Sequence, residues 1–230
     1  MPRRPRLVLP DVPMHIIQRG NNKQACFFES ADYLNYLDWL REYAIDCHCQ
    51  VHAYVLMTNH VHLLLTGKYD DSPGRLMKRL GQRYVQYINR TYERSGTLWE
   101  GRFRSCLVCE ETYLLRCYRY IELNPVRGGI VSDPANYRWS SYRANAQGEP
   151  DALVTAHPVY DSLGPSDASR AQCYRLLFEN QLKPESIEEI RQATNGNYVL
   201  GSTRFRSRVA EALNCRTSRG KPGRPLAKQK

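Results

Sequence analysis

Two histidines in an apolar run are the residues whose type and spacing most directly suggest chemistry. His60 and His62 lie in the run 55–65, which reads VLMTNHVHLLL. In a strand, side chains alternate between the two faces, so both imidazoles point one way and Val61 points the other. Buried imidazoles need a partner, and a divalent metal ion is a common one. Taken alone, the pattern is also typical of strand histidines that are satisfied by carbonyls or water.

A tyrosine and an asparagine form the second candidate set. Tyr120 and Asn124 are four residues apart in a predicted helix over 111–124, so they stack on one helical face. A tyrosine hydroxyl is a weak nucleophile until it is positioned and partly deprotonated. A metal ion held by the two histidines would polarise a phosphodiester for attack by Tyr120, with Asn124 as a further ligand. Side-chain chemistry alone does not separate Tyr120 from Tyr118 or Tyr113.

The hydrophobic periodicity predicts an α+β chain that would position these residues. Strands are predicted over 14–19, 50–57 and 60–65, with a fourth in 98–108, and helices over 30–48, 72–94 and 111–124. The order β-α-β-β-α-β-α resembles the split βαβ arrangement, an antiparallel sheet with helices packed on one face. We divide the chain into a domain over 1–143, a linker over 144–168, and a helical extension over 169–230 with a basic tail that is disordered until bound.

Positive charge indicates a nucleic-acid partner. The net charge is +10, and residues 201–230 carry nine Lys or Arg against one Glu. Clustered cations bind phosphates through counterion release. An arginine stripe on the predicted helix 72–94 is interpreted as a phosphate track, because only Glu93 interrupts it. The candidate DNA-binding residues are Arg75, Arg79 and Arg83 on this stripe, the strand residues Arg102 and Arg104, and Arg224 in the tail.

The composition argues against a membrane or secreted protein. No run approaches the roughly 18 apolar residues that a membrane span needs, and the basic start lacks the apolar stretch of a signal peptide. The eight cysteines are expected as small buried hydrophobes in a reducing compartment, without a structural zinc site. We therefore expect a cytoplasmic protein that associates with the nucleoid.

Five segments together resemble a known family. They read TNHVHLL over 58–64, GTLWEGRFR over 96–104, YIELNPVR over 120–127, WSSY over 139–142 and RGNN over 19–22. Together they resemble the REP-associated tyrosine transposases, a branch of the single-tyrosine HUH transposases. The resemblance is collinear over about residues 10–143, which makes it far more specific than any one motif.

The resemblance implies a ferredoxin-like HUH fold and a metal-dependent enzyme. The resemblance implies that His60 and His62 bind Mg²⁺ or Mn²⁺ and that Tyr120 is the nucleophile. Asn124 occupies the position where related insertion-sequence transposases usually have Gln. The implied activity is an endonuclease and strand-transferase that cuts single-stranded or hairpin DNA at REP-like palindromic repeats through a covalent 5′-phosphotyrosine. The matching segment 19–22 adds Arg19 and Asn21 as DNA contacts.

Two alternatives stay open at this point. A non-catalytic protein that binds or regulates structured nucleic acid would explain the charge but would leave the histidine pair without a purpose. A homodimer and a monomer are both compatible with the resemblance. The remaining histidines, His15, His48, His52 and His157, lack partners at ligand spacing and are expected to be structural.

Overall fold

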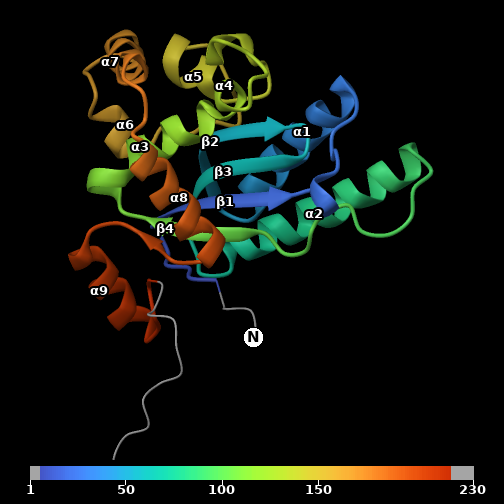
Figure 1. Ribbon diagram of the computed structural model, residues 1–230, viewed down its shortest axis with the longest axis horizontal. Coiled ribbons are helices and arrows are strands. Elements are labelled where there is room, and N and C mark those ends of the chain that lie inside the picture. Colours follow the sequence, from blue (N-terminus) through green and yellow to red (C-terminus); the bar gives the residue numbers. More distant parts are fainter. Residues whose placement is uncertain (1–5, 219–230) are drawn as a thin grey trace, which may run out of the picture.

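One five-stranded sheet organises the molecule, and its strand order is β2-β3-β1-β4-β5 (Figure 1). The computed structural model describes residues 6–218, with the side chains of residues 110–112 left undescribed. The strands are β1 (Pro13–Arg19), β2 (Cys49–Met57), β3 (His60–Gly67), β4 (Arg104–Val108) and β5 (Val199–Leu200). The helices are α1 (Ser30–Asp46), α2 (Ser72–Thr91), α3 (Glu110–Glu122), α4 (Asn124–Arg127), α5 (Tyr142–Gln147), α6 (Pro158–Asp161), α7 (Asp167–Glu179), α8 (Pro184–Gly196) and α9 (Thr203–Leu213).

The first four strands have the predicted β-α-β-β-α-β order. β1 lies between β3 and β4 and is antiparallel to both, and β2 and β3 form a hairpin across the Thr58-Asn59 turn. In the register of β1 and β3, Ile17 lies opposite His62 and Arg19 lies opposite His60. This register places His60 at the start of β3, opposite the last residue of β1, and His62 two residues further along the strand. The α+β class is therefore confirmed.

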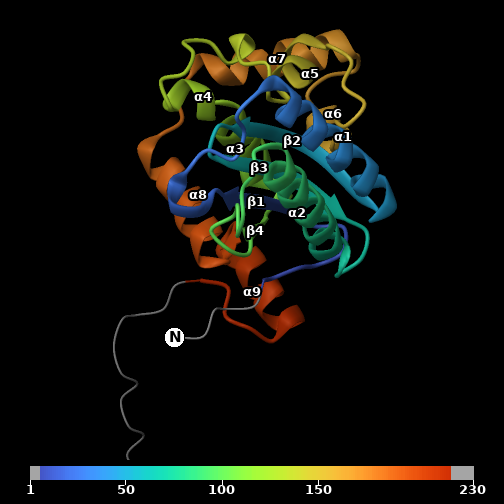
Figure 2. The same cartoon turned by 90° about the vertical axis from the view of Figure 1, so that its right-hand side faces the viewer.

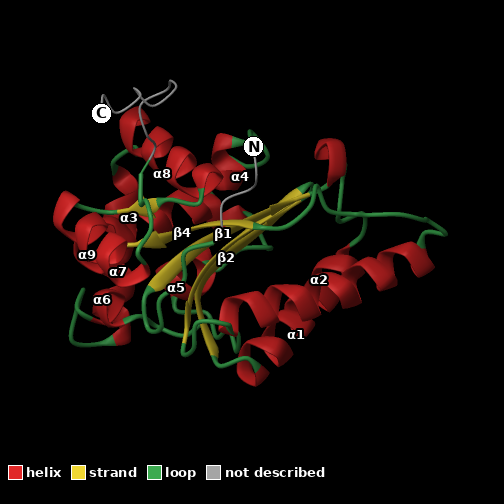
Figure 3. Cartoon of the chain, turned by 90° about the horizontal axis from the view of Figure 1, so that it is seen from below, coloured by secondary structure: helices red, strands yellow, loops and turns green. Residues whose placement is uncertain are grey.

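Helices cover both faces of the sheet, which corrects the expectation that they pack on one face. The helices α1 and α2 lie on one side, and α3 and α8 lie on the other (Figures 2 and 3). The reason is that the strands are apolar on both faces: Val61 and Leu63 pack toward α1 and α2, whereas Leu64 and Cys106 pack toward α3. The second apolar face needs its own cover, because water would otherwise contact it.

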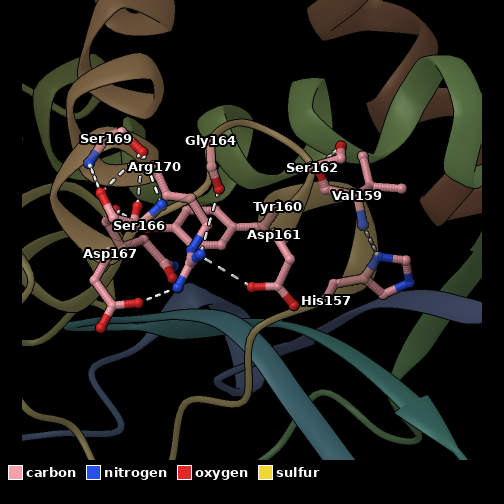
Figure 4. A network of polar contacts seen from close by, with 11 residues as sticks. His157, Val159, Tyr160, Asp161, Ser162, Gly164, Ser166, Asp167, Ser169 and Arg170 are labelled. Carbon is pink, nitrogen blue, oxygen red and sulfur yellow. Dashed lines mark hydrogen bonds and ion pairs between the residues drawn. The ribbon is translucent and has the colours of Figure 1, made fainter.

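The segment expected as a linker is packed against the sheet. Thr155 donates its backbone N–H to the Val51 carbonyl at 2.7 Å, next to a bridge between Val154 and Val51. Polar contacts hold the following turn, as Figure 4 shows: the backbone N–H of Val159 donates to His157 Nδ1 at 3.1 Å, and Arg170 contacts Asp161 at 3.6 Å. The boundaries drawn at residues 143 and 168 remain a prediction.

The extension predicted to be helical contains α7, α8 and α9 within the residues that the structure describes. The strand β5, only two residues long, was not predicted; it pairs in parallel with β4 at the sheet edge. Residues 169–218 thus contribute both a strand and a covering helix to the sheet. The helices within 6–218 include none that is long and apolar enough to cross a membrane.

A buried histidine far from the predicted site gives the fold a pH-dependent stability. His52 on β2 is 1% exposed, donates Nδ1–H to the Thr155 carbonyl at 2.8 Å, and lies 2.8 Å from Thr66 Oγ1 through Nε2. Burial lowers the pKa of His52 from 6.5 to about 4. Because the unfolded chain binds this proton at higher pH than the folded one, the contribution is complete above about pH 6.5 and is lost as the pH falls toward 4.

We expect the replacement His52→Gln to remove the pH-dependent contribution that His52 makes to the free energy of unfolding. Between pH 7.5 and pH 4 the wild-type protein should lose about 3 kcal/mol more of its unfolding free energy than the variant, at about 1.4 kcal/mol per pKa unit. Urea unfolding followed by circular dichroism at both pH values measures the difference. Equal losses in the two proteins would contradict the assignment.

Candidate active site

The histidine pair lies on the sheet face that α3 covers. The rings of His60 and His62 are 5.0 Å apart between centroids, and His62 is 2% exposed. His60 Nδ1 is 2.6 Å from Asn59 Oδ1, and the Asn59 amide group itself donates to the Lys23 carbonyl at 3.0 Å. The Asn59 oxygen therefore accepts a hydrogen bond from His60 Nδ1–H. This leaves the Nε2 lone pair of His60 available.

A third histidine, His15 on β1, lies against the pair and was missed by the sequence analysis. Its Nε2 atom is 2.8 Å from His62 Nδ1, and the two rings stack with centroids 5.0 Å apart. The strand alternation in MHIIQR already puts His15 on the same face as Ile17 and Arg19. The missing information was the pairing of β1 with β3, which brings this face next to His62.

The Tyr120 side chain packs across these rings from α3. Its ring centroid lies 5.7 Å from that of His62 and 5.7 Å from that of His15, both edge to face, and the residue is 5% exposed. Arg127 holds the tyrosine from the other side: its guanidinium lies 4.4 Å from the ring centroid and donates to the Tyr120 carbonyl at 2.6 Å. The structure thus brings Tyr120 and the histidine pair together within one chain.

Asn124 is oriented by its own helix. Its Nδ2 atom donates to the carbonyls of Tyr120 at 3.0 Å and Ile121 at 3.2 Å, so the amide oxygen is the atom left for other partners. Burial lowers the pKa of His60 to about 4, and the neighbouring Asn124 side chain opposes this shift only partly. Asn124, His60 and Tyr120 line one cavity, whereas the spacing predicted a shared face only for Tyr120 and Asn124.

A cavity of about 260 Å³ opens between these residues. Helix α8 contributes to its wall, so the C-terminal part of the chain closes one side of it. The lining residues are His15, Ile17, Arg19, Met57, His60, His62, Tyr120, Asn124, Arg127, Gly128, Arg191, Thr194 and Asn195. Burial lowers the pKa of His15 to about 3 and that of His62 well below 6.5, so the imidazoles are neutral at physiological pH. Neutral imidazoles keep a lone pair for a ligand.

Comparison with known proteins decides the family. A family model described as IS200-like transposase matches residues 9–124, half of the chain and the part that holds His60, His62, Tyr120 and Asn124. The chain belongs to the IS200-like transposase family. It is therefore a DNA transposase, and the predicted enzyme class of DNA transposase or nuclease is confirmed. No curated protein sequence matches the chain.

One solved structure shares the fold of this transposase. It superposes on a REP-associated tyrosine transposase bound to a REP hairpin with a TM-score of 0.56 and 16% sequence identity, covering 68% of this chain and 93% of that one. The crystal structure of a transposase candidate from Deinococcus radiodurans R1 is similar over 53% of this chain and 96% of that one, with a TM-score of 0.36 and 23% identity. The first of these likenesses establishes a shared fold.

The donor set in the transposase cavity fits a divalent metal ion. His60 Nε2 is a free nitrogen donor, and the Asn124 oxygen is a hard donor of the kind that Mg²⁺ and Mn²⁺ bind. No group of three or more His, Cys, Asp or Glu suited to a metal occurs among the residues that the structure describes, so water and substrate oxygens would complete the coordination. Imidazole is softer than the ligands Mg²⁺ prefers, which favours Mn²⁺ here.

Three of the predicted DNA-binding arginines line cavities of the transposase. Arg19 lines the active-site cavity and also a second cavity of about 380 Å³, and the two cavities share Ile17, Arg19 and Asn195. Arg102 and Arg104 line the second cavity, where Arg104 donates to Asn195 Oδ1 at 3.2 Å. Arg6 and Glu100 complete the charged part of its wall.

The arginine stripe of α2 does not reach this site. It lies on the opposite face of the sheet, and its acidic partners come mostly from the neighbouring helix α1: Arg79 pairs with Asp46 at 2.9 Å, and Arg83 pairs with Glu42 at 2.8 Å. Arg75 lies 3.6 Å from Asp71. The lack of Glu on the helix itself therefore did not mean that the arginines lack acidic partners, because Arg79 and Arg83 form ion pairs with residues of α1. A DNA role for these three arginines stays a prediction.

Two further predicted DNA contacts are placed differently. Asn21 lies in a 3-10 turn after β1, where its backbone N–H donates to the Leu98 carbonyl at 2.8 Å, and it does not line the active-site cavity. Arg224 falls outside the described residues.

Proposed function

We propose that this transposase cuts single-stranded or hairpin DNA by forming a covalent 5′-phosphotyrosine at Tyr120, with REP-like palindromes as its targets. His60, His62 and Asn124 would hold Mg²⁺ or Mn²⁺. The observation that carries the proposal is the packing of the Tyr120 ring 5.7 Å from the His62 ring, inside a cavity that also holds His60, Asn124 and three arginines. A nucleophile, metal donors and phosphate-binding cations thus share one small space.

In the proposed reaction, the phenolic oxygen of Tyr120 attacks the phosphorus of a phosphodiester. The bond from this oxygen to phosphorus forms, the bond from phosphorus to the 3′-oxygen breaks, and the strand leaves with a free 3′-hydroxyl. The phenol proton is released, and the leaving oxygen takes up a proton. When bound, the metal ion would polarise the phosphate and neutralise the charge that develops on its oxygens. A 3′-hydroxyl that later attacks the phosphotyrosine reverses these bond changes and joins strands.

Arg127 is suited to hold the phosphate that Tyr120 attacks. Its guanidinium lies over the tyrosine ring, and its Nη1 atom is buried without a hydrogen-bond partner. A buried donor without a partner costs free energy, and a phosphate oxygen would satisfy it. Burial lowers the pKa of Arg127 to about 10, which still leaves it charged at neutral pH.

We expect Arg127→Gln to slow covalent adduct formation about 100-fold, as for the loss of one charged donor in a phosphoryl-transfer site. The rate is measured with radiolabelled hairpin DNA in single-turnover reactions. Arg116→Gln is the matched control, because it removes one exposed positive charge from α3 outside the cavity and should leave the rate unchanged. A normal rate in the Arg127 variant would contradict this role.

The second cavity offers a route for the single strand next to the cut. It joins the active-site cavity at Arg19 and carries Arg6, Arg102 and Arg104 in its wall. Cations spaced along a groove track the backbone of single-stranded DNA. A single chain supplies the tyrosine, the histidines and these arginines, so we propose that a monomer can cut.

Covalent trapping tests the proposal against the binding-only alternative. The transposase is incubated with a hairpin oligonucleotide that carries a single-stranded flank, with Mn²⁺ or with EDTA, and is separated under denaturing conditions. We expect a slower-migrating protein–DNA species that forms with Mn²⁺ and is lost with EDTA. Binding of the hairpin without any adduct under either condition would favour a non-catalytic DNA-binding protein.

A further inference from the structure

We propose that His15 and Thr194 are positioning residues that hold the proton of His62 on Nδ1, so that the Nε2 lone pair of His62 is free to bind the metal ion. The inference rests on the proposed function, because it concerns how one proposed metal ligand is prepared. Neither residue was predicted as part of the site. Thr194 comes from α8, within the C-terminal extension.

A continuous buried chain of hydrogen bonds links the three residues. Thr194 Oγ1 lies 2.8 Å from His15 Nδ1, and His15 Nε2 lies 2.8 Å from His62 Nδ1. Thr194, His15 and His62 are 3%, 1% and 2% exposed, so water does not compete for these contacts. The two imidazole rings lie nearly parallel, at an interplanar angle of 14°, as an in-plane hydrogen bond between the facing nitrogens requires.

The hydroxyl of Thr194 determines which atom donates in each of these hydrogen bonds. Thr194 Oγ1 donates its only proton to the Ile190 carbonyl at 2.8 Å, and a carbonyl cannot donate in return. The Thr194 oxygen therefore accepts from His15 Nδ1–H. A neutral imidazole carries one proton, so His15 Nε2 is an acceptor and His62 Nδ1 must be the donor. The lone pair of His62 is then left on Nε2.

Two neighbouring contacts support this direction. Cys106 Sγ lies 3.3 Å from Thr194 Oγ1 and can donate its S–H to the same oxygen, which leaves the hydroxyl proton to Ile190. Burial keeps both imidazoles neutral, because His15 and His62 are 1% and 2% exposed and a buried charge without a counter-ion is costly. Charged imidazoles would place two protons between the facing nitrogens, and the 2.8 Å contact would be lost.

The same logic applies to His60, which has a separate partner. Asn59 Oδ1 accepts from His60 Nδ1, so both histidines of the pair are set with the proton on Nδ1. A metal-binding histidine usually donates its second ring N–H to such an acceptor, and loss of the acceptor typically costs 10- to 100-fold in metal affinity. For His62 the acceptor is another imidazole, which is itself fixed by a threonine from α8.

Replacing Thr194 by valine tests this series of hydrogen bonds, because the side chain keeps nearly the same shape and loses only its hydroxyl. Without the oxygen, His15 Nδ1–H loses its acceptor, so His15 moves its proton to Nε2 and His62 must move its own proton to Nε2, where it blocks the metal. We expect Thr194→Val to weaken Mn²⁺ binding about 10- to 100-fold in calorimetric titrations without DNA. Thr194→Ser, which keeps the hydroxyl, and Thr217→Val, at a buried threonine outside the cavity, should bind Mn²⁺ as the wild type does.

The proton position itself is measured by long-range ¹H–¹⁵N correlation spectra of the full chain labelled with ¹⁵N-histidine. The signals of His62 are assigned by their loss in His62→Gln. We expect the wild type to carry the His62 proton on Nδ1 and the Thr194→Val variant to carry it on Nε2. A wild-type proton on Nε2, or a valine variant with unchanged spectra and unchanged Mn²⁺ affinity, would overturn the inference.

These readouts separate this inference from the proposed function. Metal binding and proton position are measured without DNA and do not depend on the tyrosine. A wild type that shows the expected His62 proton and binds Mn²⁺ but forms no adduct would refute the covalent mechanism and leave the positioning role standing. An adduct in the wild type, with Thr194→Val equal to it in Mn²⁺ affinity and His62 spectrum, would refute only the positioning role.

Discussion

The variant Tyr120→Phe should form no covalent adduct with hairpin DNA, a loss of about 10⁴-fold or more in rate. The change removes a single oxygen, which is the nucleophile in the proposed reaction. The ring would keep its edge-to-face contacts with His62 and His15 and its contact with Arg127. We therefore expect the thermal unfolding midpoint and the DNA affinity to change little, and denaturing gels with labelled hairpin measure the loss of adduct.

The matched control is Tyr118→Phe, two residues earlier on the same helix. Tyr118 is fully buried and packs with Tyr160 and Tyr174 on the far side of α3, away from the cavity. This variant should form adduct at the wild-type rate. An adduct that survives in Tyr120→Phe and disappears in Tyr118→Phe would move the nucleophile to the other tyrosine.

The double variant His60→Ala and His62→Ala should abolish the response of cleavage to Mn²⁺. A metal ion that stabilises charge on a phosphate supplies several kcal/mol, so we expect a rate loss on the order of 10³-fold at saturating Mn²⁺. Adding more Mn²⁺ should not restore the rate, because the nitrogen donors are gone. Adduct formation as a function of Mn²⁺ concentration measures both effects.

Folding must be separated from catalysis in this test, since His62 is buried. Removing two neutral imidazoles leaves a cavity and an unpaired His15, so some stability will be lost. His52→Gln supplies the comparison: it also removes a buried histidine from this sheet, but outside the active-site cavity. At pH 7.5 it should cleave normally. Normal Mn²⁺-dependent cleavage by the double variant would contradict the assignment of the metal ligands.

Local spacing predicted which candidate residues share a face, and the family resemblance selected Tyr120 among the tyrosines. The alternation of strand side chains puts His60 and His62 on one face, and the four-residue spacing puts Tyr120 and Asn124 on one face of α3. The structure brings these residues together at the same cavity. The predicted β-α-β-β-α-β order of elements agrees with the observed sheet, although it did not by itself determine which strands are neighbours.

The residues that sequence reasoning missed depend on contacts between distant segments. His15 becomes part of the site only through the pairing of β1 with β3, and Thr194 only through the packing of α8 across the sheet. Thr194 lies 179 residues from His15 in the chain, and no periodicity connects them. The ion pairs of the α2 arginines could not be predicted for the same reason, since the acidic partners of Arg79 and Arg83 lie on α1.

The central claim, that Tyr120 becomes covalently linked to DNA, is tested most directly by mapping the linkage. Wild-type protein is incubated with hairpin DNA and Mn²⁺, the adduct is digested with nuclease and trypsin, and the peptides are analysed by mass spectrometry. Trypsin cuts after Arg119 and Arg127, and the resulting peptide 120–127 contains Tyr120 as its only tyrosine. We predict a 5′-phosphonucleotide on this peptide. Its presence instead on peptide 117–119, which carries Tyr118, or on no peptide at all, would contradict the account.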